Sequence, residues 1–264
     1  NVHFNMYAGV QNAGDGPDFL ANAQEYADIQ WLVYDNEGTV ETHPVYGPSD
    51  AAEPSFPSWA ADTRWWDEVT VKNAVIQNYD LSLSGGNENS KFFASMNYFD
   101  QDGVVLTNWY KRYSGRFNSE FNIKDRVTIG ENINVVHRSD HGTTPNGEEG
   151  GAVAMGVYRT QPIIPVKWTG DPYTGLSHTF VEGDWGGTGI APRLGNGDNW
   201  VATQTRGEDN TWQNLRVFGN VYADVKIIEG LSLRTSFGGS YGSSYYRGWT
   251  GSTYESAENT ATST

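Results

Sequence analysis

The side chains best suited to binding a solute lie in the long segment 138–211. Aromatic rings alternate there with carboxylates and amides, and the segment has no clear strand pattern. Flat rings stack on sugar rings, while amides and carboxylates accept or donate hydrogen bonds to hydroxyl groups. Such a mixture could contact a glycan or a partner protein; the alternative is that the rings pack the segment against the neighbouring strands or form an aromatic girdle at a membrane interface. The candidate ligand-binding residues are Trp168, Tyr173, Trp185, Trp200, Asp198 and Asn199.

A second set of charged side chains lies within segments that alternate polar and apolar residues. Alternation places all of them on the polar faces of strands. If those strands enclose an interior, the charges contact an inserted domain or line a passage. A structural ion-pair role and a solute-binding role are equally compatible with the sequence. The members of this set are Arg116, Glu120, Arg216, Asp224 and Arg234.

Other motifs that could support catalysis or metal binding do not lie on the secondary structure that this chemistry requires. The G-x-S-x-G string over 238–242 falls within a strand pattern, not at a strand-to-helix turn. His137 and His141 have a metal-binding spacing for a helix, but here a strand runs into a loop. The segment 35–38 (Asp-Asn-Glu-Gly) offers oxygen ligands for Ca²⁺ but lacks the alternating spacing of an EF-hand loop. We therefore expect no enzymatic activity and no resident cofactor, with Ca²⁺ left open.

Composition narrows the class of protein. The chain has 264 residues, 17 Lys+Arg, 32 Asp+Glu and a net charge of −15, which argues against binding nucleic acid through a basic face. The absence of cysteine excludes disulfides and thiolate metal sites. Aromatics reach 14% while hydrophobic residues reach only 37%, and no run is long enough for a spanning helix. Two classes remain, a soluble all-β domain and an outer-membrane β-barrel with alternating strands.

Period-two alternation predicts about seven strands. The clearest lies within 212–228, where every odd-numbered residue from Leu215 to Ile227 is uncharged. That face is longer than the ~5–6 residues of a typical soluble strand and suits the ~9–11 residues of a tilted membrane crossing. Glu131 interrupts the apolar face of one strand. The predicted strands cover 2–11, 75–85, 91–100, 111–123, 127–137, 212–228 and 231–247.

The predicted connections fall into two groups. Two are long, 12–74 and 138–211, and the remainder are short or medium in length. Short turns at one end and long loops at the other are typical of bacterial outer-membrane barrels, in which the long loops are extracellular. Within the long loops we expect a helix over 18–34, started by Pro17 and Asp18, and a helical turn over 151–160. An odd number of strands predicts a part of a longer protein, or a split chain.

Several strings then resemble, in order and spacing, the SusC/RagA family of TonB-linked outer-membrane transporters just after their plug domain. The resemblance is densest over 65–166 and looser over 1–64 and 212–247. The strings are WWDEV at 65–69, IQNY at 76–79, LSLSGGN at 81–87, SKFFAS at 90–95, YFDQDG at 98–103, YKRYS at 110–114, RVTIGEN at 126–132 and QPIIPV at 161–166.

The resemblance implies a transmembrane antiparallel β-barrel of about 22 strands, of which this chain supplies the first third after the plug. It implies import of oligosaccharides or peptides, with a SusD-like surface lipoprotein as a lid and energy passed from TonB, ExbB and ExbD through the plug. It also implies a dimer of barrel–lid pairs in the outer membrane. The plug and the remaining strands are missing from this chain, so no energy-coupling residue can be assigned.

Two alternatives stay open. A soluble glycan-binding β-sandwich would explain the aromatic content, although not the sorting of loop lengths or the ordered strings. A membrane barrel that serves as a scaffold in a surface complex, without import of its own, is also compatible with the sequence.

Overall fold

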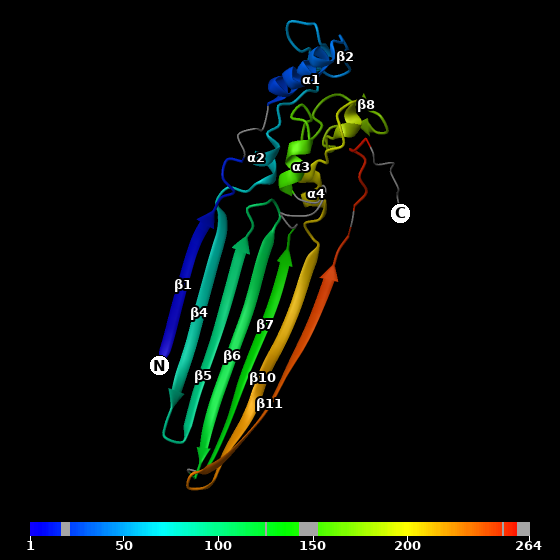
Figure 1. Cartoon of the computed structure of the whole chain (residues 1–264). Coiled ribbons are helices and arrows are strands. Elements are labelled where there is room, and N and C mark those ends of the chain that lie inside the picture. Colours follow the sequence, from blue (N-terminus) through cyan, green and yellow to red (C-terminus); the bar gives the residue numbers. More distant parts are fainter. Residues whose placement is uncertain (17–21, 125, 143–152, 250, 258–264) are drawn as a thin grey trace.

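The computed structural model describes residues 1–16, 22–124, 126–142, 153–249 and 251–257. Its main element is a seven-stranded antiparallel sheet with the strand order β1-β4-β5-β6-β7-β10-β11 (Figure 1). Each pair of neighbours in this order is consecutive along the chain among the seven long strands; long connections join β1 to β4 and β7 to β10. The strands are β1 (Val2–Gln11), β4 (Ala74–Gly86), β5 (Ser90–Asp102), β6 (Trp109–Ile123), β7 (Val127–His141), β10 (Thr211–Ile228) and β11 (Leu231–Arg247).

The pairing register gathers the apolar residues of all the strands onto one face. One row across the sheet shows this, because each residue is paired with the next: Phe4, Leu81, Met96, Gly115, Val135, Val217 and Tyr241. Most large side chains on this face are exposed; Phe4 is 57% and Phe237 78% accessible. A soluble sandwich would cover such a face with a second sheet, but the other sheets among the described residues are two-stranded pairs.

The height of the apolar face fits a hydrocarbon layer. On β6 it extends from Tyr113 to Ile123, and its rows continue through β7 and β10. At ~3.4 Å per residue and a tilt of ~35–45°, that stretch rises by roughly 24–28 Å, close to the ~25 Å apolar band of outer-membrane barrels. The fold class expected from the sequence, part of a β-barrel wall, is therefore confirmed. Within the described ranges, no helix has both the length and the apolar character needed to cross a membrane.

Short turns join the strands at one end of the sheet, which we call the turn end. The opposite end, the loop end, carries the two long connections (Figure 1). β7 continues to His141, beyond the predicted end at residue 137, because Arg138 and Asp140 pair with both β6 and β10. The second long connection therefore begins later than the predicted residue 138.

The two long connections fold together into one cap over the loop end. Thr63 donates its backbone N–H to Pro162 O at 2.7 Å, and its hydroxyl to Ile164 O at 2.7 Å. The indole of Trp65 donates to Gln161 O at 3.1 Å. Small elements build the cap: α1 (Ala23–Glu37), β2 (Thr42–His43), β3 (Gly47–Pro48), α2 (Trp65–Val69), α3 (Val153–Arg159), β8 (Tyr173–Thr174), β9 (Thr179–Phe180), the 3₁₀ turn η1 (Thr188–Ile190) and α4 (Trp200–Arg206).

The first helix begins later than predicted. Asn22 is its N-cap, and a capping box joins Asn22 to Glu25, so α1 starts at Ala23. The predicted start at Pro17 and Asp18 lies outside the described residues. α1 continues past Tyr34 until Gly38 adopts a left-handed conformation with φ of 67°. The predicted turn over 151–160 corresponds to α3, and its first two residues lie outside the described ones.

Candidate functional site

Three of the six predicted ligand-binding residues are core residues of the cap. Trp168 is 3%, Trp200 6% and Asn199 1% accessible. Their sequence context resembles that of a binding loop because the cap needs the same residue types to build its own interior. Burial removes both indole faces from contact with a solute.

The contacts of these residues explain the burial. Trp168 donates its indole N–H to Gly170 O at 3.0 Å and Asp171 O at 2.9 Å. Asn199 is the N-cap of α4, accepting the N–H of Ala202 at 3.0 Å. Its amide also donates to Val166 O and Gly186 O, each at 2.8 Å. All of these bonds lie within the cap, so their role is structural.

The other three predicted residues lie at the surface of the cap. Tyr173 is 36% accessible and stacks on Trp168 with ring centroids 5.4 Å apart. Trp185 carries the Lys167 ammonium 4.1 Å above its ring. Asp198 is exposed, and its backbone carbonyl accepts the Thr160 hydroxyl at 2.8 Å. These residues remain available to a ligand or partner, but they do not line the cavity described below.

The five predicted interior charges all lie on the polar face of the sheet, opposite the apolar rows. Glu120 accepts the Tyr222 hydroxyl at 2.8 Å, and Arg234 lies 4.6 Å above the Tyr222 ring. Arg234 also approaches Asp224 at 4.0 Å. Near the turn end these residues form one network, which favours a structural contribution to the polar wall.

The remaining two charges make looser contacts. Arg116 donates to Asn118 Oδ1 at 3.3 Å, and Arg216 lies 5.5 Å from the Phe218 ring centroid. The register places both residues on the polar face, and neither has a carboxylate partner among the ion pairs of the described residues.

The structure reveals an aromatic cavity that the sequence did not indicate. It has a volume of about 280 Å³ and lies where β7, β10 and β11 meet the cap at the loop end. Trp212 at the start of β10 is paired with Tyr246 on β11, and Trp249 follows that strand. We call these three side chains the aromatic platform. Their exposed fractions are 50%, 48% and 69%, so all three rings offer free surface.

The scaffold holds the aromatic platform in place from behind. Trp212 and Tyr246 have ring centroids 4.6 Å apart. Asn210 clamps the backbone of Trp249, accepting its N–H at 2.6 Å and donating to its carbonyl at 3.1 Å. The His141 ring, through Nδ1, lies 2.6 Å from Asn210 O, which links the clamp to the end of β7.

The polar lining of the cavity carries little free charge. Arg206 makes a two-pronged ion pair with Glu255, at 2.5 and 2.8 Å. Burial lowers the pKa of Arg206, but the hydrogen bonds and charge of Glu255 outweigh burial and leave that pKa above its ordinary value. With this cation neutralised, the cavity combines three aromatic faces with hydrogen-bonding groups. That chemistry suits a neutral ring with hydroxyl or amide groups.

The residues of the candidate metal-binding and catalytic motifs do not come together into a site. Within the described ranges, no group of three or more His, Asp or Glu residues is arranged to hold a metal ion. Asp35 and Glu37 lie in the last turn of α1, next to its Gly38 cap. His137 lies near Tyr113 on the apolar face, with ring centroids 6.3 Å apart, while His141 lines the aromatic cavity. The G-x-S-x-G string lies within β11.

Comparison with known proteins identifies relatives of one kind. TonB-dependent receptor P26 of Formosa agariphila is 25% identical over 89% of this chain and 20% of its own length. TonB-dependent receptor P3 of the same organism is 30% identical over 67% of this chain and 16% of its own length. TonB-dependent receptor SusC of Bacteroides thetaiotaomicron is 26% identical over 72% of this chain and 20% of its own length. No family model matches the sequence.

Solved structures agree on the fold. The RagAB peptide transporter matches with a TM-score of 0.60 and 19% identity, over 90% of this chain and 27% of the matched chain. The closed-closed state of the RagAB peptide importer matches with a TM-score of 0.59 and 18% identity, over 92% of this chain and 28% of the matched chain. The chain thus spans about a fifth of the length of the curated relatives it matches.

Proposed function

Because this chain is a SusC/RagA-like part of a TonB-dependent transporter barrel, we propose that the whole protein imports oligosaccharides or peptides across the bacterial outer membrane. The observation that carries the proposal is the apolar face, which stays in register across all seven strands and is backed by a polar face. Such a wall separates lipid from an aqueous interior, which is what an import barrel needs.

Loop lengths and the distribution of tyrosines orient the wall. The turn end faces the periplasm, and the cap faces the outside of the cell. Tyr79, Tyr98 and Tyr113 form a row on the apolar face towards the loop end, with centroids 6.2 and 4.8 Å apart. Amphipathic rings of this kind favour the boundary between hydrocarbon and head groups, so the row marks the outer boundary.

The aromatic platform is the proposed contact for the solute. It lies beside the cap at the loop end, where an imported molecule would enter the barrel. Trp212 and Tyr246 lie on the polar side of their strands, the side that faces the barrel interior. The platform suits sugar rings better than strongly charged peptides, because Arg206, the Lys or Arg side chain among the described lining residues, is paired with Glu255.

A SusD-like lipoprotein lid is the proposed partner at the cap. α1 exposes a stripe of apolar side chains: Ile29, Leu32 and Val33 have exposed fractions of 51%, 57% and 47%. The helix buries Ala23 and Ala27 on another side, and it lies far from the sheet (Figure 1). An exposed apolar stripe at the outermost point of the cap favours protein docking.

TonB with ExbB and ExbD would act through a plug, and barrel–lid pairs would associate as dimers.

The proposal is tested by measuring solute binding to the full-length protein. Trp212→Ala removes one face of the aromatic platform, and one lost stacking contact should weaken binding about 5- to 30-fold, from ~1–2 kcal/mol. Trp185→Ala is the matched control, because it removes an indole from the cap surface outside the cavity. The measurement is calorimetric titration with mixed oligosaccharides and, separately, with mixed oligopeptides.

Three outcomes are informative. Loss of binding with Trp212→Ala alone supports the platform, and the mixture that binds identifies the solute class. Loss with Trp185→Ala alone would move the site to the surface of the cap. Binding of neither mixture, with no solute uptake by cells that carry the protein, would favour a scaffold barrel.

A further inference from the structure

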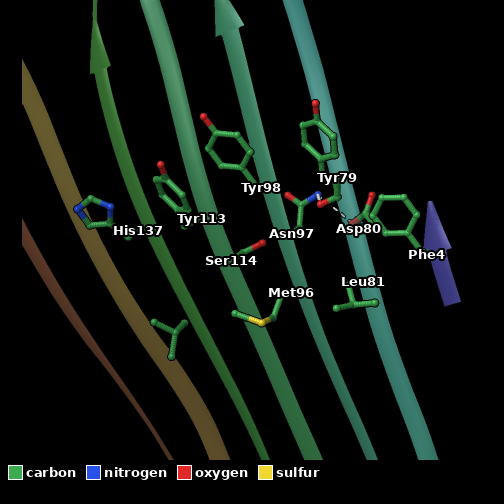
Figure 2. Close-up of a pocket in the computed structure, with 12 residues that line it drawn as sticks. Phe4, Tyr79, Asp80, Leu81, Met96, Asn97, Tyr98, Tyr113, Ser114 and His137 are labelled. Atoms are coloured by element: carbon green, nitrogen blue, oxygen red, sulfur yellow. Dashed lines mark hydrogen bonds between the residues drawn. The ribbon is translucent and has the colours of Figure 1, made fainter. Parts of the chain in front are cut away.

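A hollow on the apolar face lies apart from the aromatic cavity. Its volume is about 460 Å³, and it runs across β1, β4, β5, β6 and β7. Figure 2 shows Tyr79, Tyr98, Tyr113 and His137 in line across four strands, with Leu81 and Met96 on the side towards the turns. Phe4 and Val135 close the two ends of the lower row.

The hollow exists because a glycine interrupts a row of large side chains. Gly115 is paired with Met96 on one side and Val135 on the other. A Cβ at Gly115 would have only Ser95 O within 4 Å, at 3.9 Å, so the space above it is open. Met96 stands beside this gap with 70% of its surface exposed. Methionine adapts its shape to apolar ligands more readily than branched side chains do.

Polarity rises in steps from the hollow towards the loop end. The row of Leu81, Met96 and Gly115 is apolar. In the next row, Tyr79 donates its hydroxyl to Gln77 Oε1 at 2.9 Å, and Tyr98 donates to Asp100 Oδ2 at 2.6 Å. In the third row, Lys111 lies 3.7 Å from Asp100, with 43% of its side chain exposed.

We propose that this hollow seats one acyl chain of a membrane lipid from the leaflet on the cap side, with its polar head group beside Tyr98 and Lys111. The order of apolar, phenolic and charged rows matches an amphiphile from tail to head. The volume falls within the ~300–1,000 Å³ of sites for single small molecules. A protein partner would instead cover a wide area of the apolar face, on the order of 800 Å², and would not be confined to this hollow. The inference rests on the proposed membrane placement of the sheet.

The test uses photoreactive lipid and the full-length protein in vesicles of phosphatidylethanolamine, a fraction of which carries a diazirine in the acyl chain. Labelled residues are mapped by mass spectrometry of peptides. We expect labelling at 94–98 and 133–137 to exceed labelling at similar depth on β10 and β11. Gly115→Leu fills the hollow and should reduce that excess several-fold.

Gly239→Leu is the matched control. It makes the same change on the apolar face of β11, where a Cβ meets no atom within 4 Å. It should leave the labelling at Met96 and Val135 unchanged. Denaturant unfolding of both variants in the same vesicles checks that each of them folds, independently of solute binding.

Three results would overturn the inference in different ways. Even labelling of the whole apolar face, unchanged by Gly115→Leu, would show ordinary lipid contact without a seated chain, and the membrane placement would stand. Absence of label from the entire apolar face would overturn the membrane placement, and the proposed function with it. Protection of the hollow by a co-purifying protein chain would also overturn the seated lipid.

Discussion

At the scale of residues, the cap is held by polar contacts whose partners lie far apart in the chain. Asp184 is a clear case. Its carboxylate accepts the Val181 N–H at 2.9 Å, lies 3.0 Å from His178 Nε2 and accepts the Tyr254 hydroxyl at 3.3 Å. These bonds join the β9 region to the segment that follows β11. One carboxylate therefore ties together two parts of the cap.

This carboxylate predicts a pH dependence. Burial raises the pKa of Asp184, but the bonds from Val181, His178 and Tyr254 outweigh burial and leave that pKa below its ordinary value. A depressed pKa contributes stability above the ordinary carboxyl value of ~3.9, and that stability is lost as pH falls through the folded pKa. We expect hydrogen exchange in 178–189, corrected for intrinsic rates, to accelerate between pH 5 and pH 3.

Asp184→Asn provides the control for this prediction. The amide cannot carry the charge, so the variant should show faster exchange in 178–189 already at neutral pH and little further change on acidification. Equal protection of the original protein at both pH values would refute the role of Asp184.

At the scale of elements, one polar pair stands out on the apolar face. Glu131 on β7 lies opposite Ser119 on β6 and Val221 on β10. Ser119 is 6% accessible and donates its hydroxyl to the Glu131 carboxylate. Placing a carboxyl group on a lipid-facing surface costs free energy, and the hydrogen bond from Ser119 partly offsets that cost.

Removing the hydroxyl group and then the carboxyl group of this pair should have opposite effects on stability. Ser119→Ala leaves the carboxyl group unpaired and should lower the free energy of unfolding by ~1–3 kcal/mol. Adding Glu131→Leu to that variant should restore the loss or exceed it, because an apolar side chain suits this face. Ser114→Ala, on the opposite face of β6, is the control and should have a small effect.

The measurement for this cycle is denaturant unfolding of the full-length barrel in lipid, comparing the single and double variants. If Glu131→Leu destabilises the barrel as much as Ser119→Ala does, the pair faces a protein or an aqueous surface, and the lipid-facing assignment of this row is wrong.

At the scale of the whole molecule, the chain has two parts, a wall of strands and a folded cap. Strands supply the barrier, while two connections far apart in sequence build the structure above it (Figure 1). The cap core includes Tyr46 and Trp65 from the first connection and Ile163 and Phe180 from the second. Because each connection buries its apolar residues against the other, the cap can hold the exposed stripe of α1 in a fixed position.

The stripe on α1 makes the lid proposal testable on the intact assembly. Leu32→Glu places a charge in the apolar stripe and should reduce co-purification of the lipoprotein about 5- to 30-fold, from ~1–2 kcal/mol at one buried contact. Gln24→Glu adds the same charge in the first turn of α1, away from the stripe, and should leave retention unchanged. Mass spectrometry of the detergent-extracted full-length protein reports both the partner and its amount.

An extract that contains the full-length protein with no partner chain would contradict the lid. Equal retention by both variants would leave a lid in place but remove α1 from its docking surface.

Alternation was enough to predict the strands and their two faces, while the loop lengths and the family resemblance were needed to predict a barrel wall. On β10, residues such as Val217 and Val221 alternate with Arg216 and Asn220, and this period-two pattern is a local property of the chain. The pattern also put Arg234 and Asp224 together on a polar face, although only the register brought them within 4.0 Å of each other. Strand ends were less predictable, because pairing partners, not local residue types, carried β7 to His141.

The sequence by itself therefore determined the fold class, the sidedness of the strands and the family resemblance. Tertiary structure decided which aromatic rings face solvent. Trp168 and Trp200 looked like ligand contacts, yet the cap buries them, with Gly156 leaving room for the Trp200 indole. Trp212 and Tyr246 lay within predicted strands and Trp249 just beyond one, yet the three meet at a cavity. The physical reason is that burial and convergence depend on contacts between distant segments, whereas alternation depends only on neighbours along one strand.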